Sequence, residues 1–182
     1  MLAHNDQYYF DVSDLEELID YYMERVELDK AWKVLELATR QHPHSSEFEL
    51  KRAEILSLKG EFEKAMESIR LLEAIMPNNA EMLVTKASIL SKTGNHRKAV
   101  QIYERALENA EQKSEIRLLL SYEYQSLGNQ PEAISQLKMG IMDNPEDVGL
   151  IYELCFLYDI SGESESAIVF LKKHLDEHPY QY

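Results

Sequence analysis

The stretch AEMLVTKASILSKTGNHRKAVQIYERALENAEQK, residues 80–113, decides the fold. Its apolar residues Leu83, Ala87 and Leu90 are spaced i, i+4 and i+7, so they lie on one face of a helix. Gly94 then ends this helix, because glycine adopts the left-handed backbone conformation that other residues avoid. The stretch therefore predicts a helix, a tight turn and a second helix.

The same pattern recurs every 34 residues in both directions without insertion or deletion, and a repeat of this length indicates stacked helical units. The glycine recurs at Gly60, Gly94, Gly128 and Gly162, and an alanine recurs at Ala31, Ala65, Ala99, Ala133 and Ala167. A closing position reads Pro43, Pro77, Glu111, Pro145 and Pro179. We therefore predict one domain over residues 12–181, made of registers 12–45, 46–79, 80–113, 114–147 and 148–181.

Two further columns explain how the helices pack. A mostly small column lets the two helices of one hairpin approach closely: Ile19, Ala53, Ala87, Ser121 and Cys155. A bulky column fills the space between hairpins: Leu35, Ile69, Tyr103, Leu137 and Leu171. Proline ends the second helix of each hairpin, because the residue before a proline is pushed out of the helical region.

This combination resembles the tetratricopeptide repeat family over about nine-tenths of the chain. The resemblance implies an all-α, right-handed superhelical solenoid of five helix-turn-helix hairpins that binds another polypeptide along its first helices. The family's frequent tryptophan near the start of the first helix is absent. Glu111 replaces a closing proline, but the unbroken period favours a surviving turn there, with Ser114 as the N-cap of the next helix.

The first and last registers depart from the pattern, as the ends of a solenoid should. Asp14 stands where other registers have Phe48, Met82, Ile116 and Leu150, so we expect it to face water. Residues 1–11 form either an apolar flap over the first hairpin, through Tyr8 to Phe10, or a tail. At the other end Leu171, His174 and Leu175 mark a face that packs on a second chain, packs on further repeats, or frays.

Composition narrows the partner. The formal net charge of −14 disfavours nucleic acid, whose phosphates need a basic surface. It also disfavours an acidic membrane surface, and the sequence contains neither a signal peptide nor a membrane span. Cys155 is the single cysteine, which fits a reducing compartment, so we expect a cytoplasmic protein.

No constellation of residues predicts catalysis, a cofactor or a metal. Cys155 falls in the small packing column, so it is interpreted as a core residue and not as a nucleophile. The pair His42 and His44 has no third ligand nearby in sequence. Phosphate-binding glycine loops and hydrolase motifs do not occur. The chain is therefore predicted to be non-enzymatic.

The most informative feature is an apolar gradient along the first helices. The residues one place after the packing stripe point toward the predicted groove, and they become aliphatic and aromatic toward the C-terminus. The predicted partner-binding residues are Val84, Leu118, Leu119, Tyr122, Tyr152 and Phe156. Partial burial by neighbouring helices is the alternative interpretation. We expect an adaptor for a peptide or helical segment, and the alternatives are self-assembly through the terminal faces or a docking fragment of a larger protein.

Overall fold

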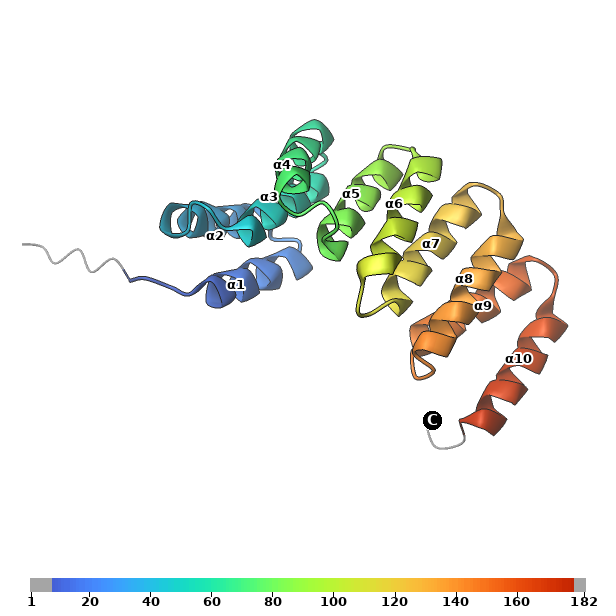
Figure 1. Cartoon of the computed structure of the whole chain (residues 1–182). Helices are drawn as coiled ribbons and strands as arrows, with labels where there is room; N and C mark the ends of the chain where they lie inside the picture. Colours follow the sequence, from blue (N-terminus) through green and yellow to red (C-terminus); the bar gives the residue numbers. More distant parts are fainter. Residues whose placement is uncertain (1–7, 179–182) are drawn as a thin grey trace, which may run out of the picture. The chain divides into compact units, whose positions relative to one another are not determined.

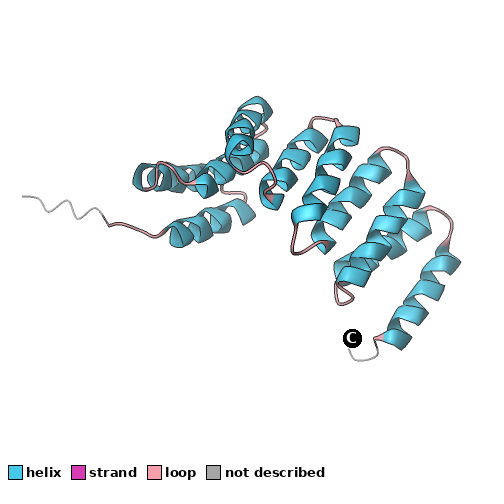
Figure 2. Ribbon diagram, in the orientation of Figure 1, coloured by secondary structure: helices cyan, strands magenta, loops and turns pink. Residues whose placement is uncertain are grey.

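The structure is a computed structural model that describes residues 8–178. All regular structure in this part of the chain is helical (Figures 1 and 2). The helices are α1 (Val12–Glu24), α2 (Leu28–Gln41), α3 (Ser46–Leu58), α4 (Phe62–Ile75), α5 (Ala80–Lys92), α6 (His96–Asn109), α7 (Ser114–Ser126), α8 (Gln130–Asp143), α9 (Val148–Ile160) and α10 (Ser164–Glu177). The predicted all-α helical-hairpin solenoid is confirmed.

The chain divides into two compact units, which we describe separately. Unit 1 is Met1–Asn78 and contains α1 to α4, and unit 2 is Asn79–Tyr182 and contains α5 to α10. Within each unit, a first helix and a second helix form a hairpin, and each hairpin packs on its neighbour in sequence. The assignment of residues 12–181 to one domain stays a prediction.

Each first helix begins at the first residue of a register, and in α3, α5 and α9 the side chain of the preceding residue caps the helix. Ser45, Asn79 and Asp147 adopt extended backbone conformations, and their side chains accept hydrogen bonds from the amides of Phe48, Met82 and Leu150. A cap of this kind satisfies an amide that the helix cannot pair. Sequence reasoning missed this column, although Asp11, Ser45, Asn79 and Asp147 share its spacing.

The junction between α6 and α7 shows what replaces the missing proline. Helix α6 ends at Asn109, and Ala110 has an extended backbone with φ −83° and ψ 137°. The expected turn therefore survives beside Glu111. The prediction of Ser114 as N-cap was wrong by one position, because Ser114 is already helical and Lys113 precedes it. The Lys113 side chain makes no capping hydrogen bond, so α7 begins without the cap that α3, α5 and α9 possess.

The turns between first and second helices have the predicted left-handed residue. Gly60, Gly94, Gly128 and Gly162 have φ between +72° and +77°. Val26 occupies the same place in the first register with φ +58°. A β-branched side chain is strained in this region, since its Cβ approaches the neighbouring carbonyl oxygen. Val26 is also 76% exposed, so burial does not compensate for the strain.

The core of unit 1 follows the two packing columns. Ile19, Ala31 and Ala53 are fully buried, and Leu35 is 1% exposed. Ile19, Ala31 and Leu35 join Leu15, Ala38, Phe48 and Ile55 in one apolar cluster of α1, α2 and α3. Asp14 is exposed, as the sequence predicts.

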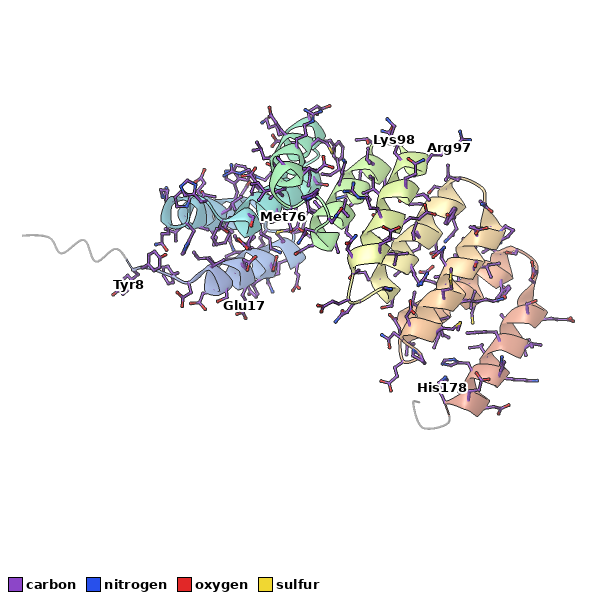
Figure 3. The ribbon with its side chains drawn as sticks, viewed as in Figure 1. Tyr8, Glu17, Met76, Arg97, Lys98 and His178 are labelled. Atoms are coloured by element: carbon purple, nitrogen blue, oxygen red, sulfur yellow. The ribbon has the colours of Figure 1, made fainter. Side chains whose placement is uncertain are left out.

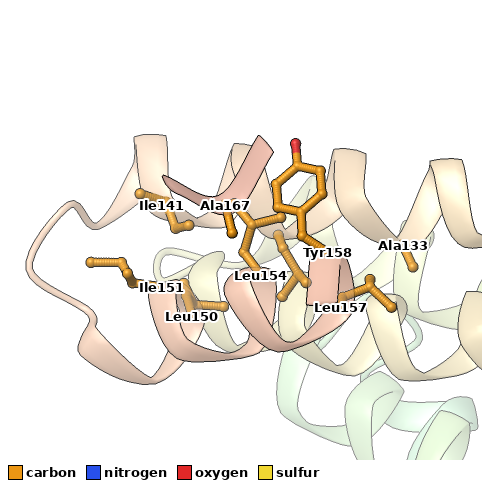
Figure 4. Packing of buried hydrophobic residues seen from close by; sticks show 9 residues of the cluster. Ala133, Ile141, Leu150, Ile151, Leu154, Leu157, Tyr158 and Ala167 are labelled. Carbon is orange, nitrogen blue, oxygen red and sulfur yellow. The ribbon is translucent and has the colours of Figure 1, made fainter. Parts of the chain in front are cut away.

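The core of unit 2 is regular up to its last hairpin. Ala87, Ala99, Ser121 and Ala133 are fully buried. A cluster from α8, α9 and α10 continues this core through Leu137, Leu150, Leu154, Leu157, Tyr158 and Ala167 (Figure 4). In the last hairpin, however, Cys155 and Leu171 are only half-buried, whereas their column partners are buried. Helix α10 is therefore less tightly covered than the other second helices.

Replacing Val26 with glycine should stabilise the folded state. The change removes a strained left-handed valine, and we expect a gain of roughly 1 kcal/mol after the entropy cost of glycine. Thermal unfolding followed by circular dichroism measures it. The control is Gly60→Val, which should lower the melting temperature, because it introduces the same strain at a site where φ is +77°. Equal melting temperatures for Val26→Gly and the native chain would contradict the strain argument.

Replacing Lys113 with aspartate should stabilise α7. Aspartate caps a helix and interacts favourably with the positive end of the helix dipole, whereas lysine does neither, so we expect a gain of about 1 kcal/mol. The shift of the urea unfolding midpoint measures the gain. Asp147→Ala is the matched control in the same unit, and it should cost a similar amount because it removes the hydrogen bond from the Leu150 amide. If Asp147→Ala lowers stability and Lys113→Asp leaves it unchanged, the cap position of α7 is misassigned.

Candidate binding surface

Three aromatic side chains of unit 2 are exposed on the first helices α7 and α9. Tyr122 is 39% exposed, Phe156 48% and Tyr152 67%. Tyr152 and Phe156 are four residues apart on α9, so they share a face of the helix. Their rings stack with centroids 6.5 Å apart and planes inclined by 6°. We name Tyr122, Tyr152 and Phe156 the aromatic surface.

Tyr122 is fixed to the neighbouring first helix. Its hydroxyl donates a hydrogen bond to the Glu153 carboxylate on α9. Partial burial raises the pKa of Tyr122, and the negative charge and hydrogen bond of Glu153 raise it further. The neutral hydroxyl is therefore held as a donor, and α7 and α9 are linked at the aromatic surface.

The aliphatic members of the predicted groove differ from the aromatic ones. Val84 on α5 and Leu118 and Leu119 on α7 are half-buried, and Leu118 packs against the core cluster of α8 and α9. The alternative interpretation, partial burial by neighbouring helices, therefore describes these three residues. The six predicted residues lie on three successive first helices of one unit.

The residues of the predicted C-terminal face are placed differently from one another. Leu175 is 45% exposed and Leu171 is half-buried. His174 is 5% exposed, and its ring contacts those of Phe170 and His178 at centroid distances of 5.8 and 4.7 Å. His174 is therefore a packing residue, and Ile168, which sequence reasoning did not select, is 52% exposed on the same helix.

Residues 8–10 are held against the end of α2. The Gln41 side chain donates to the Tyr8 carbonyl (2.8 Å) and accepts from the Phe10 amide (3.0 Å). His42 Nε2 donates to the Phe10 carbonyl at 2.9 Å, and its Nδ1 lies 3.2 Å from the Tyr9 hydroxyl. His42 thus positions a backbone segment. Residues 1–7, the rest of the proposed flap or tail, lie outside the described residues.

Sequence reasoning missed a hollow in unit 1 around the single tryptophan of the sequence. The hollow has a volume of about 640 Å³ and is lined by Trp32, Arg52, Lys59 and Leu71 among others. Arg52 and Lys59 approach the Trp32 ring to 5.7 and 5.3 Å from its centroid. Lys59 also pairs with Asp29 at 3.0 Å. The single tryptophan could have drawn attention to this region. Its basic neighbours Arg52 and Lys59, however, belong to the next hairpin, and the repeat pattern does not predict their contact with Trp32.

Side chains suited to chemistry are dispersed. Cys155 is half-buried, and burial raises the pKa of its thiol, which lowers the thiolate fraction at neutral pH. Among residues 8–178, three or more histidine, cysteine, aspartate or glutamate side chains do not gather in a metal-binding group. Over the same residues, each helix is too short or too polar to cross a membrane.

Comparison with known families identifies the repeat. The family model described as tetratricopeptide repeat matches residues 80–113, which contain α5, the Gly94 turn and α6. Residues 80–113 form a tetratricopeptide repeat. The resemblance seen in the sequence is therefore confirmed, and the other four registers share the spacing of this tetratricopeptide repeat. A comparison with curated proteins found no match.

Solved structures of tetratricopeptide repeat proteins share the fold. TTC0263, a thermophilic protein of Thermus thermophilus, is 18% identical with a TM-score of 0.72, covering 92% of this chain and 92% of that chain. PilF of Pseudomonas aeruginosa is 17% identical with a TM-score of 0.73, covering 93% and 76%. MamA is 20% identical with a TM-score of 0.68, covering 96% and 100%. At these identities the likeness shows the fold alone.

The Tyr122–Glu153 link gives a titration prediction. Because burial and Glu153 raise the pKa of Tyr122 above 10.0, its hydroxyl should stay neutral at a pH where ordinary tyrosines ionise. The stability that it contributes is present below the unfolded pKa and is lost as pH rises through the folded pKa. Tyrosinate absorbance of the native chain minus that of Tyr122→Phe isolates this transition.

The same difference measured in a Glu153→Gln background should occur at lower pH, since the negative charge is gone. It should remain above 10.0, because burial is the larger cause of the shift. An unchanged transition in Glu153→Gln would show that the two side chains do not interact in solution.

Proposed function

We propose that this chain is a non-enzymatic adaptor that binds a peptide or helical segment of another protein on the first helices of unit 2. Folds of this type generally mediate protein–protein interaction. The observation that carries the proposal is the aromatic surface, in which Tyr122, Tyr152 and Phe156 are exposed although they lie beside a well-packed core.

The physical argument rests on the cost of exposing aromatic rings in water. Tyr152 and Phe156 each present a large apolar area to solvent, and a partner that covers it gains free energy in proportion to that area. Their stacking and the Tyr122–Glu153 hydrogen bond fix the rings before a partner arrives. Fixed anchors lose little conformational entropy on binding, so few residues can supply most of the affinity.

The flanking residues favour an apolar segment with a hydrogen-bonding or basic side chain. Val84, Leu118 and Leu119 add half-buried aliphatic area along the same first helices. Glu153 is half-buried beside Tyr122 and carries a negative charge. Aliphatic or aromatic residues of the partner would pack on Tyr152 and Phe156, and a cation would lie near Glu153.

The class and place of the partner follow from composition. A net charge of −14 favours a protein partner over nucleic acid, because phosphate contacts require clustered lysine and arginine. The single cysteine fits a reducing compartment, so the binding is assigned to the cytoplasm.

The test is selection of binding peptides from a random display library on the native chain. Peptides rich in aliphatic and aromatic residues should be enriched, and their dissociation constants can be measured by fluorescence polarisation. The double variant Tyr152→Ala with Phe156→Ala should weaken binding by roughly 30-fold or more, as loss of two anchors does. Both residues are exposed, so the melting temperature should change little.

The matched control replaces two exposed apolar residues of second helices in the same unit, Met142 and Val169, by alanine. They are 79% and 67% exposed, and binding should persist in this variant. The proposal fails if the selected peptides bind the Tyr152→Ala with Phe156→Ala variant as tightly as the native chain.

A further inference from the structure

Helices α1 and α10 each expose two apolar side chains whose columns hold buried apolar residues elsewhere in the chain. On α1, Leu18 is 41% and Tyr21 51% exposed, and on α10, Ile168 is 52% and Leu175 45% exposed. In the same columns the apolar residues buried to 8% exposure or less are Leu120, Leu154, Ile55, Ile89, Leu157, Val100 and Ile141, whereas Arg52, Lys86, Glu73 and Glu123 are charged. Within residues 8–178 these side chains are left uncovered, so each face could form one half of a hairpin–hairpin contact.

We propose that a second copy of this chain covers these faces, with α1 of one copy packed on α10 of the other. The contact would repeat the one that α3 makes on α2 and α9 makes on α8. It goes beyond the adaptor function, because it uses the terminal hairpins and leaves the aromatic surface free. Figure 3 labels Glu17, which lies on α1 next to Leu18 in sequence, and His178, which directly follows α10.

The contacts between successive hairpins follow a constant spacing, which makes the proposal specific. The Tyr124 hydroxyl donates to Glu104 at 3.0 Å, and Lys138 lies 5.5 Å from the centroid of the Tyr158 ring. In both pairs a tyrosine follows its partner by the same number of residues. One register after Lys138, the same column holds Lys172. The position that would face Lys172 belongs to the next hairpin, and the first hairpin of a second copy has Tyr22 at this position. A cation thus meets a tyrosine again.

A second spacing joins opposite charges. Asp29 near the start of α2 pairs with Lys59 after α3 at 3.0 Å. The position equivalent to Asp29 in the last register is Glu165, and the position equivalent to Lys59 in the first register is Arg25. The copies therefore place a carboxylate of α10 opposite a guanidinium after α1, in the same order as the pair inside unit 1.

A third pair, with the same spacing as Glu104 and Tyr124, concerns the apolar centre of the contact. Arg52 lies over the Trp32 ring, with its guanidinium carbon 5.7 Å from the centroid. The position equivalent to Arg52 in the first register is Leu18, and the position equivalent to Trp32 in the last register is Ile168. In the contact between copies, two exposed aliphatic side chains would therefore meet. Their burial is the favourable term that drives association.

Two further contacts concern the position of Asp14. A Cβ added at Gly140 would lie 3.1 Å from Leu150, and the His42 ring lies 5.8 Å from the Phe48 ring. In the last register, the positions equivalent to Gly140 and His42 are His174 and His178. In the first register, the position equivalent to both Leu150 and Phe48 is Asp14. In the contact between copies, Asp14 would therefore lie near His174 and His178. Burying a carboxylate costs free energy unless it is paired or hydrogen-bonded, and imidazoles are suitable partners. Because His174 is 5% exposed, the half-buried His178 is the imidazole that Asp14 would meet in this contact.

The proposed contact is heterologous, because different faces of the two copies meet. Such a contact leaves one free end on each assembly, so growth continues into longer head-to-tail chains unless the rotation closes a ring. The structure therefore points to concentration-dependent association of this chain with itself.

The test blocks one face at a time. Leu18→Glu blocks the α1 face and Ile168→Glu blocks the α10 face, and both residues are exposed enough for the fold to persist, which circular dichroism checks. Sedimentation velocity from about 1 to about 100 µM, a range suited to weak specific contacts, should show association of the native chain. Each variant alone should associate at least about tenfold more weakly.

An equimolar mixture of the two variants decides the geometry. The intact α10 face of Leu18→Glu can meet the intact α1 face of Ile168→Glu, so the mixture should form a species of twice the mass of one chain and nothing larger. A native chain that stays single over this concentration range overturns the proposal. So does self-association of either variant at native strength, because it would mean contact between two identical faces or through another surface.

Two further variants keep the result specific. Leu58→Glu is the matched control, since Leu58 is 47% exposed and its column already holds Glu24 and Lys92, so association should be unchanged. Arg25→Glu and Glu165→Arg should each weaken association severalfold, and the chain carrying both changes should recover it. Failure of the double exchange to recover association would overturn the assigned register.

Discussion

Every hairpin of this chain has to be covered by its neighbour, and the rest of the structure depends on that constraint. A pair of helices buries the face that the two share, but its outer faces remain apolar until another hairpin packs there. The fully buried Ile19, Ala53, Ala87 and Ser121 show how close the helices approach within a hairpin. Leu35 and Leu137, at 1% and 0% exposure, fill the space toward the next one. Stability in each unit is thus a chain of nearest-neighbour contacts.

The same constraint decides where the sequence is free to vary. Positions outside the packing columns contribute little to the stacking, so they can hold residues selected for binding. Tyr152 and Phe156 are such positions, since they lie on α9 next to the buried Leu154 and Leu157 and are themselves exposed. A rigid core directly beneath exposed rings holds the rings in one arrangement, which favours binding because less entropy is lost when a partner arrives.

The fold could be predicted from the period because glycine, alanine and proline act locally, whereas the site depends on distant contacts. The left-handed turn at Gly94 needs only its own residue, and φ there is +76°. The N-cap of α7 was misassigned by one residue, since the capping column at Ser45 and Asp147 is polar and escaped a search for apolar repeats. The half-burial of Cys155 and Leu171 was also beyond the sequence, because it depends on how closely α10 approaches α9. Exposure of Tyr122 could be expected, but its hydrogen bond to Glu153 needs the distance between two helices.

The terminal registers show how a repeat protein balances solubility against association. A capping register with polar residues throughout would end the array. Here Asp14 replaces the apolar residue of the stacking column and Glu16 replaces the apolar residue of the groove column, while Leu18 and Tyr21 remain exposed. One carboxylate is enough to make an unpaired face unfavourable for a purely apolar partner, because burying it alone costs more than the surrounding leucine and tyrosine gain. A partner with histidines at the matching place removes that cost. In the proposed contact Asp14 acts as a selector: it disfavours purely apolar surfaces and favours one that carries an imidazole, as the α10 face does through His178.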